Sequence, residues 1–338
     1  LLGIAEPAER DPDLALFRLR MAASARVRAH LPGDIGGFAA AITTGDRSAI
    51  SQAALQNLRS SNLAHLLAIS GLHMGLLSAV VFGAARLILA LHPVSATGWP
   101  SRSIAAAAAL IAATGYLALS GGNVATERAY IMCAVALCAL MIGRRAISLR
   151  AVAVAGIIVL ILRPEALMGP GFQMSFAATT ALVAIFGWMR DFEGEVIPKR
   201  LRPVAAVVIS SAVAGFATAP ISAAHFNTVA HYGLVANLLS VPLMGVLVIP
   251  AAVLAAILAP IGGEGLPLWA MGLGLRWILS VADLVAHLPG ARSFVPGPGG
   301  WVLPLLSLGF LWLILWQGRM RWLGGPSMLL SFALWQGA

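Results

Sequence analysis

One hydrophobic segment holds the side chains best suited to polar chemistry. Its polar residues, in an otherwise apolar run from 62 to 78, are Asn62, His65, Ser70 and His73. On a helix of about 100° per residue these side chains share an arc of about 140°. Gly71 and Gly75 fall on the opposite side. The pattern predicts a helix with one polar face and one face for close helix packing.

Three kinds of chemistry were weighed for this polar face. Ser70 and His73 suggest nucleophilic catalysis, but they lack the turn of a catalytic serine and a nearby carboxylate to orient the imidazole. Metal binding is disfavoured because His65 and His73 lie about two helical turns apart. Unpaired polar groups are costly in hydrocarbon, so we interpret the face as the lining of a translocation path or as hydrogen bonds between packed helices. We predict no catalytic residue, metal or cofactor.

Other apolar segments also contain polar residues. Arg128 follows Glu127, so the arginine either meets an anion inside the protein or belongs to an ion pair at the membrane surface. The other path-lining candidates are Gln173, Ser211, Thr218 and Asn237, with Gly215 as a packing position. Hydroxyls at such positions also simply bond neighbouring helices. The candidates for ion pairs or structural hydrogen bonds are Asp46, Arg47, Glu127, Asp283 and His287.

Composition indicates an integral membrane protein. The 338 residues are 59% hydrophobic and 10% charged, whereas soluble domains carry about 25% charged residues. The apolar runs are continuous, unlike the alternating strands of a membrane barrel. We therefore predict an all-α fold, a polytopic transmembrane helical bundle.

Ten apolar segments are candidate membrane spans. They lie at about 62–90, 102–120, 125–143, 150–162, 168–188, 203–222, 231–258, 266–288, 301–317 and 322–336. The fourth is short enough to be a half-helix. The seventh contains Pro242 and Pro250, which remove backbone hydrogen bonds and predict a kinked or broken helix.

The N-terminal part differs from these spans. We expect residues 1–60 to form a tail and amphipathic helices, and residues 61–338 to form the transmembrane domain. Between 13 and 60, arginines alternate with apolar residues at helical spacing, which favours helices in the membrane interface. A helical hairpin packed on the bundle fits the same pattern. The chain does not begin with Met, and we expect it to be part of a longer protein.

Charge suggests an orientation and a partner. Loops after odd-numbered spans carry most of the Lys and Arg, which predicts that these loops are cytoplasmic and that both termini face outward. The formal net charge of +9 is explained by this topology or by a polyanionic substrate or anionic lipid.

Several motifs together resemble the ComEC family, the DNA-uptake channel of naturally competent bacteria. Residues 65–73, His-Leu-Leu-Ala-Ile-Ser-Gly-Leu-His, look like the family's hallmark. The other matching motifs are Gly45-Asp46-Arg47 and residues 128–132, 170–176, 217–220 and 233–242. They cover nearly the whole chain in order. Glu127, directly before Arg128, departs from the pattern and could neutralise the arginine.

The resemblance implies a function and its partners. The chain would be the channel domain that passes single-stranded DNA through the bacterial inner membrane during natural transformation, and it would not be an enzyme, since the family's nuclease-like domain is absent from this chain. Outward-facing OB-like and metallo-β-lactamase-like domains, a DNA receptor, a cytoplasmic ATP-driven motor and the lipid bilayer would be its partners. A secondary transporter of a small solute or anion remains the alternative, and a membrane-embedded hydrolase is the third hypothesis.

Overall fold

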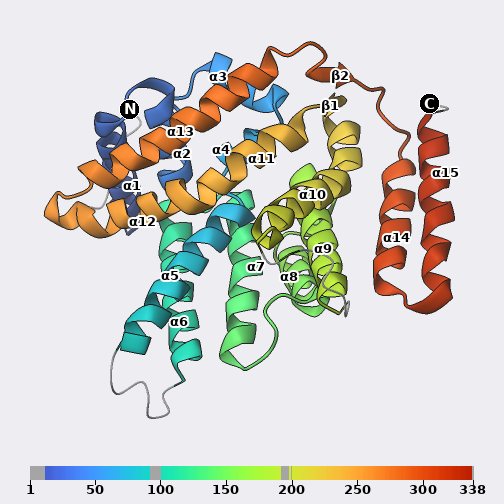
Figure 1. Cartoon of the computed structure of the whole chain (residues 1–338), viewed down its shortest axis with the longest axis horizontal. Helices are drawn as coiled ribbons and strands as arrows, with labels where there is room; N and C mark the ends of the chain where they lie inside the picture. Colours follow the sequence, from blue (N-terminus) through green and yellow to red (C-terminus); the bar gives the residue numbers. More distant parts are fainter. Residues whose placement is uncertain (1–11, 92–99, 192–197, 199, 337–338) are drawn as a thin grey trace, which may run out of the picture. The chain divides into compact units, whose positions relative to one another are not determined.

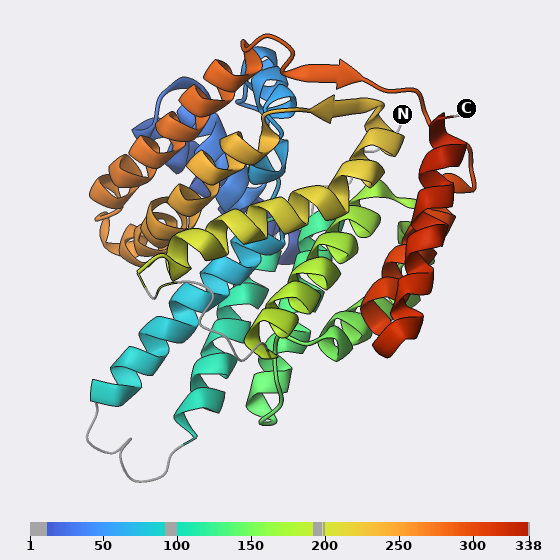
Figure 2. The ribbon, with the colours of Figure 1, turned by 45° about the vertical axis from the view of Figure 1, so that its right-hand side comes forward.

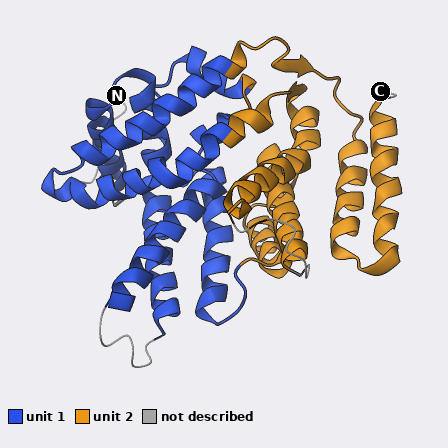
Figure 3. Cartoon of the chain, in the orientation of Figure 1, with its two compact units in different colours: residues 1–59, 63–146, 239–284 blue, residues 60–62, 147–238, 285–338 orange. Residues whose placement is uncertain are grey.

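The computed structural model describes residues 12–91, 100–191, 198 and 200–336. They divide into two compact units that interleave along the sequence (Figure 3). Unit 1 comprises residues 1–59, 63–146 and 239–284, and unit 2 comprises residues 60–62, 147–238 and 285–338. Within the described ranges, helices are interrupted by two three-residue strands. The predicted all-α fold is therefore confirmed.

Unit 1 begins with helices that differ in burial. They are α1 (Pro12–His30), α2 (Gly33–Thr44) and α3 (Gln52–Ser60). Residues 38–42 of α2 are at most 1% exposed. Gly37 permits this packing, because a Cβ there would lie 2.6 Å from the Ala49 carbonyl oxygen. α2 is thus a packed core helix and not an interfacial one, whereas α1 exposes Leu16, Phe17 and Leu19 as an interfacial helix would.

The first predicted span is broken near its start. Asn62 has a positive φ of 62°. The short helix α4 (Ala64–Leu67) ends at Ala68, which is extended, and α5 (Gly71–Leu91) starts three residues later. The prediction of one helix through residues 62–78 is therefore wrong, and the arc drawn on it does not exist.

α5 forms a three-helix bundle with α6 (Ser101–Leu119) and α7 (Val124–Met141) (Figure 1). Small side chains allow the close approach. Met74 of α5, Ala113 of α6 and Ala129 of α7 form one buried cluster. Because α6 connects the other two, α5 and α7 run in the same direction and begin at the same end of the bundle.

The seventh span, predicted to be kinked or broken, is a continuous helix with a π-helical irregularity. The segment consists of α11 (Gly233–Leu243), a π-helical stretch (Met244–Val248) and α12 (Ile249–Leu258). Pro242 and Pro250 flank the π-helical stretch. Each proline lacks the N–H that would donate a helical hydrogen bond, and the change in helix type accommodates this loss. α13 (Gly265–Ala286) follows in unit 1. A short 3-10 turn, Ala259–Ile261, joins α12 to it.

Unit 2 contains two groups of packed helices, visible in Figure 2. The first holds α8 (Leu149–Leu162), a 3-10 turn (Pro164–Met168), α9 (Pro170–Asp191) and α10 (Arg202–Phe226). The second is a hairpin of α14 (Val302–Leu315) and α15 (Gly324–Gln336) around a 3-10 turn (Gly318–Leu323). The strands β1 (Thr228–Ala230) and β2 (Arg292–Phe294) pair antiparallel.

All ten apolar segments contain helices, but their lengths differ. Seven described helices are long and apolar enough to cross a membrane, counting 233–261 as one. α8 and α14 are apolar but shorter, and α15 has 13 residues. The fourth segment is the predicted short helix. It ends at Arg163, before Pro164, because the residue preceding a proline disfavours helical geometry.

Candidate functional site

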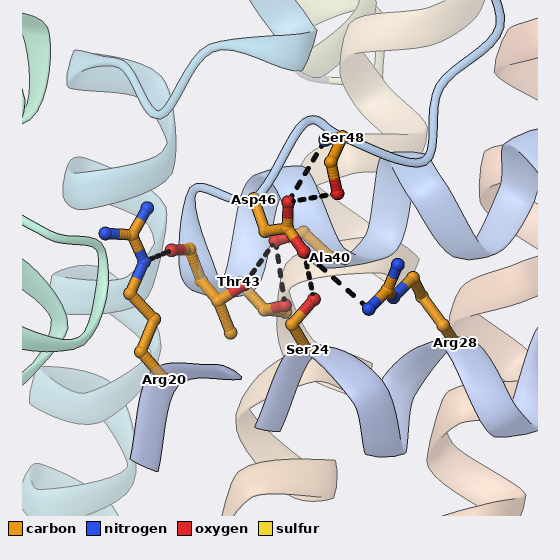
Figure 4. Close-up of polar contacts among 8 residues, drawn as sticks. Arg20, Ser24, Arg28, Ala40, Thr43, Asp46 and Ser48 are labelled. Atoms are coloured by element: carbon orange, nitrogen blue, oxygen red, sulfur yellow. Dashed lines mark hydrogen bonds and ion pairs between the residues drawn. The ribbon is translucent and has the colours of Figure 1, made fainter. Parts of the chain in front are cut away.

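A cluster centred on Asp46 joins α1 to the loop after α2 (Figure 4). Its carboxylate accepts hydrogen bonds from the Ser24 hydroxyl at 2.5 Å, the Ser48 hydroxyl at 2.7 Å and the Ser48 N–H at 3.0 Å. Arg28 Nη2 lies 4.0 Å from the carboxylate. Ser24 is fully buried and Asp46 is 9% exposed. Asp46 is thus held by structural hydrogen bonds and has Arg28 as its ion-pair partner, while Arg47 is exposed.

The hydrogen bonds determine the charge state of Asp46. Burial alone would raise the pKa of this carboxyl group. The bonds from Ser24 and Ser48 and the positive charge of Arg28 outweigh that effect and hold the pKa below its usual value. The carboxylate is therefore ionised at neutral pH. The spacing of Arg20, Ser24 and Arg28, four residues apart on one face of α1, is the sequence signal that could have identified these partners.

Gly45 holds the same loop against the turn between α6 and α7. Its φ of 75° ends α2, and a Cβ there would lie 2.6 Å from the Ser120 carbonyl oxygen. Arg20 Nε donates a 2.7 Å hydrogen bond to the Thr44 carbonyl, and the Tyr116 hydroxyl donates to the Ile42 carbonyl. The Gly-Asp-Arg motif therefore anchors the N-terminal helices on one end of the α5–α6–α7 bundle.

Ser70 and His73 are joined at the beginning of α5. The Ser70 hydroxyl lies 3.1 Å from His73 Nδ1, which also faces the Ser70 N–H at 3.4 Å. The return of a side chain to the N–H of the residue preceding the helix resembles a capping box, with histidine in the place of glutamate. This local bond explains why a new helix starts at Gly71.

The two histidines have different environments. His73 is fully buried, whereas His65 in α4 is exposed and lies within electrostatic reach of His73. His73 Nε2 is buried without a hydrogen-bond partner among the described residues. Ser70 and His73 are within hydrogen-bond distance, as a catalytic Ser-His pair would be. A catalytic triad would also require a carboxylate bonded to the imidazole, and none is found within the described ranges.

The glycine face of α5 does not pack as predicted. A Cβ built at Gly71 or Gly75 would meet no described atom within 4 Å. The packed face instead carries His73, Met74 and Ser78, and the Ser78 hydroxyl lies 3.0 Å from Cys133 Sγ of α7. The assignment of Gly71 and Gly75 to helix packing is therefore wrong. α5 turns its polar groups inward because neighbouring helices and Ser70 give them partners.

Arg128 lies in the first turns of α7. Asn123 caps this helix by accepting hydrogen bonds from the N–H groups of Ala125 and Thr126. Arg128 is half-buried, its Nε is buried without a partner, and among the described residues no carboxylate is recorded as its ion-pair partner. Glu127 lies in the first turn of α7, and this residue also takes part in a polar or electrostatic interaction.

Arg128 and His73 lie at the same level of the bundle. His73 directly precedes Met74 and Arg128 directly precedes Ala129, and Met74 and Ala129 belong to the same buried cluster. The same end holds Thr126, which is fully buried and whose hydroxyl has no hydrogen-bond partner within the described ranges. An apolar bundle thus carries, near the first turns of α5 and α7, polar groups that the described protein satisfies only in part.

In unit 2, Gln173 has a clear structural partner. Its Oε1 lies 2.8 Å from His225 Nε2, and its Nε2 donates to the Leu167 carbonyl at 3.0 Å, which joins α9 to the end of α10. The exposed Asn62 contacts Gly233, where a Cβ would come within 2.8 Å of Asn62 Nδ2. Each contact includes one residue of a motif named above, Gln173 of 170–176 and Gly233 of 233–242.

The other predicted residues of unit 2 are less connected. Thr218 donates to the Ala214 carbonyl of its own helix at 2.8 Å, and Ser211 is half-buried on the same helix. Gly215 has no described atom within 4 Å of an added Cβ, so its packing role is not observed. Asn237 Oδ1 is buried and has no hydrogen-bond partner in the part of the chain that the structure describes. The path-lining candidates are divided between the units: His65, Ser70, His73 and Arg128 belong to unit 1, and the other path-lining candidates belong to unit 2.

Two carboxylates at the ends of α13 complete unit 1. Asp283 accepts a 2.8 Å hydrogen bond from Asn57 Nδ2, so it links α13 to α3; its pairing with His287 stays a prediction. Glu264, which the sequence reading missed, is 4% exposed and pairs with Arg26 of α1. Backbone hydrogen bonding lowers the pKa of Glu264, and Arg26 and the nearby His30 add to this, against the effect of burial.

The polar groups near the first turns of α5 and α7 are suited to binding an anion or a chain of polar groups. Within the described ranges, no group of three or more His, Cys, Asp or Glu side chains could hold a metal ion. Among the described residues at these first turns, those with an unsatisfied buried polar atom are His73, Thr126 and Arg128, and none of them carries a negative charge.

Comparison with known proteins identifies the family. A family model described as Competence protein matches residues 42–320. ComE operon protein 3 of Bacillus subtilis (strain 168) is 26% identical over 291 residues, which cover 84% of this chain and 35% of that protein. The chain thus spans about a third of the length of this relative. No solved structure matches it. Because the family match includes both units and every motif described above, the chain belongs to the competence protein family.

Proposed function

We propose that the chain is the membrane channel domain through which single-stranded DNA enters the cytoplasm during natural transformation. The observation that carries the proposal is Arg128, a half-buried arginine in an apolar bundle whose Nε has no partner among the described residues. A buried cation is costly unless an anion or water reaches it. A phosphate of a passing strand is such an anion.

The other polar groups fit the same role. Transported DNA requires a path that stabilises phosphates and tolerates every base, with few strong anchors. His65, exposed and within electrostatic reach of the buried His73, and Thr126, two residues before Arg128, offer further polar contacts. We propose Asn62, Ser70, Gln173, Ser211, Thr218 and Asn237 as further lining residues.

The family resemblance supplies the partners and orientation that we propose. Both termini would face outward, where OB-like and metallo-β-lactamase-like domains of a longer protein and a DNA receptor would deliver the strand. A cytoplasmic ATP-driven motor would pull it. The proposed outward end of unit 1 carries the Asp46 cluster and the turn between α6 and α7.

Uptake of labelled DNA tests the proposal. Arg128→Ala, introduced into the full-length protein, should lower DNA entry and transformation at least about tenfold, because a phosphate contact in a site of low dielectric is lost. Arg128→Lys should retain part of the activity. His65→Ala and His73→Ala should reduce entry less, since neutral groups contribute less than a charge.

A matched control separates path lining from folding. Arg102→Ala removes an exposed arginine at the far end of the same bundle and should leave uptake unchanged. Membrane insertion of each variant is measured by protease protection. Normal uptake by a stably inserted Arg128→Ala variant would refute the assignment of this residue.

One observation favours the transporter alternative. The π-helical stretch between Pro242 and Pro250 makes one membrane helix irregular, and irregular or discontinuous helices occur at the binding sites of transporters. A transporter would bind its solute in purified form and would not require DNA. Saturable uptake of a small anion by proteoliposomes, without DNA entry in cells, would favour this function.

A further inference from the structure

The β1–β2 ribbon, residues 228–230 and 292–294, presents an exposed aromatic ring beside a cation. Phe294 is 81% exposed, whereas phenylalanine side chains are usually buried. The Arg292 guanidinium carbon lies 5.3 Å from the centre of its ring. The two residues are separated by one position, so they lie on the same face of β2.

The partner strand leaves this face open. Antiparallel pairing places Thr228 opposite Phe294 and Ala230 opposite Arg292. Both opposing side chains are small, so they do not cover the ring. The other face of the ribbon is tied together, since His231 Nε2 lies 2.6 Å from the Ser293 hydroxyl.

Hydrogen bonds at both ends make the ribbon a rigid support. The Val295 N–H donates to the Asn227 carbonyl at 3.0 Å, and the His231 N–H donates to the Ala291 carbonyl at 3.1 Å. The Tyr232 hydroxyl adds a 3.1 Å bond to the Pro289 carbonyl. A ring on such a support loses little conformational entropy when a ligand stacks on it.

Charge identifies the ligand class. No acidic residue occurs between 284 and 301, the segment that contains β2 and joins α13 to α14, whereas Arg292 does. Among the described residues no carboxylate is recorded as a partner of Arg292. An exposed ring beside a free guanidinium is the combination that binds single-stranded nucleic acid, because the ring stacks on a base and the cation meets a phosphate.

We infer that the Arg292–Phe294 face of the β1–β2 ribbon binds single-stranded DNA by stacking a base on the Phe294 ring. The inference rests on the proposed function. In the proposed orientation the loops after the sixth and eighth spans face outward, which places the ribbon where the strand enters. Stacking on one ring is independent of sequence and weak enough to be released, as transport requires.

Binding of oligothymidylate to the chain in nanodiscs tests this inference. The wild-type chain should bind oligothymidylate more tightly than an abasic strand of equal length. Phe294→Ala should weaken oligothymidylate binding about tenfold and abolish the preference, whereas Phe294→Trp should retain both. Arg292→Ala should reduce the slope of log affinity against log salt by about 0.7.

Phe216→Ala is the matched control. Phe216 is also 81% exposed but lies inside α10, among apolar residues of a membrane span. Its loss should leave DNA binding unchanged. Iodouracil in the oligonucleotide should form a photochemical crosslink to Phe294 and none to Phe216.

The contrary results are distinct. Wild-type affinity in Phe294→Ala, in a chain that binds and imports DNA, overturns the inference alone. Labelling of Phe294 by a photoactivatable lipid without a crosslink to the oligonucleotide assigns the ring to the membrane interface and also overturns it. Failure of the wild-type protein to import DNA would refute the proposed function itself.

Discussion

At the scale of single residues, Asp46 carries the clearest energetic role. Its carboxylate accepts three hydrogen bonds and faces Arg28 while nearly buried. Asp46→Asn should lower the free energy of unfolding by about 1–3 kcal/mol at neutral pH, because it removes the charge from these interactions. Thermal or denaturant unfolding of the detergent-solubilised chain measures the loss.

The pKa shift of Asp46 gives this prediction a pH dependence. The folded-state pKa is lower than the unfolded value of about 3.9. The carboxylate therefore stabilises the fold above that value, and its contribution disappears as pH falls through the lowered pKa. The wild type and Asp46→Asn should converge in acid, and a difference that persists there would contradict the charge-based explanation. Asp34→Asn should lower the free energy of unfolding less, because Asp34 accepts hydrogen bonds from Ser51 but has no ion-pair partner among the described residues.

Residue types predicted where polar groups occur but not which groups they contact. Asp46 was expected in an ion pair or structural hydrogen bonds without a named partner, and its partners Ser24 and Arg28 come from another helix. Gly71 and Gly75 were expected at a helix interface, and they have no close neighbour. Helical spacing gives the faces of a helix but not which face the neighbouring helices cover.

At the scale of elements, the turn at Gly45 fixes the N-terminal helices to the bundle. Gly45→Ala should be strongly destabilising, since an alanine there adopts a left-handed conformation at about 1–2 kcal/mol and overlaps the Ser120 carbonyl. Gly143→Ala is the matched control. Gly143 has a φ of 72° and no described atom within 4 Å of an added Cβ. Equal melting temperatures for the two variants would show that the contact contributes nothing.

The α14–α15 hairpin depends on a close glycine contact. A Cβ at Gly309 would lie 2.7 Å from the Gly324 carbonyl oxygen and 2.8 Å from Met328 Cγ. Gly309→Ala should therefore separate the helices and destabilise the hairpin by about 1–3 kcal/mol. Gly325→Ala, where an added Cβ meets no described atom within 4 Å, should be tolerated. Spin-label distances across the hairpin measure the separation, and an unchanged distance in Gly309→Ala would contradict the packing described.

The two helix irregularities were not equally predictable. Pro242 and Pro250 indicate the π-helical stretch between them directly, because proline removes backbone hydrogen bonds wherever it stands. The break before α5 depends on Asn62 in a left-handed conformation and on the bond between Ser70 and His73. Asparagine and serine favour turns over helix interiors, but the apolar run around them gave the stronger signal for a continuous helix.

At the scale of the whole molecule, hydropathy predicted the helices but not their grouping. Ten apolar segments were expected and all contain helices, of which seven are long enough to span. The sequence suggested a division at residue 60, whereas the structure contains two units that interleave along the chain. α11, for example, begins in unit 2 and ends in unit 1. Contacts between segments far apart in sequence create these units, and no local pattern encodes them.

The proposed path can be tested directly by crosslinking a strand during its passage. A photoreactive amino acid is placed at residue 65, 128 or 216 of the full-length protein in competent cells, and DNA uptake is stalled by a bulky group at one end of the strand. We predict crosslinks to DNA from positions 65 and 128 and none from position 216, which lies exposed on α10. Crosslinks from none of the three positions, in variants that still import DNA, would contradict the proposal that these residues line the path.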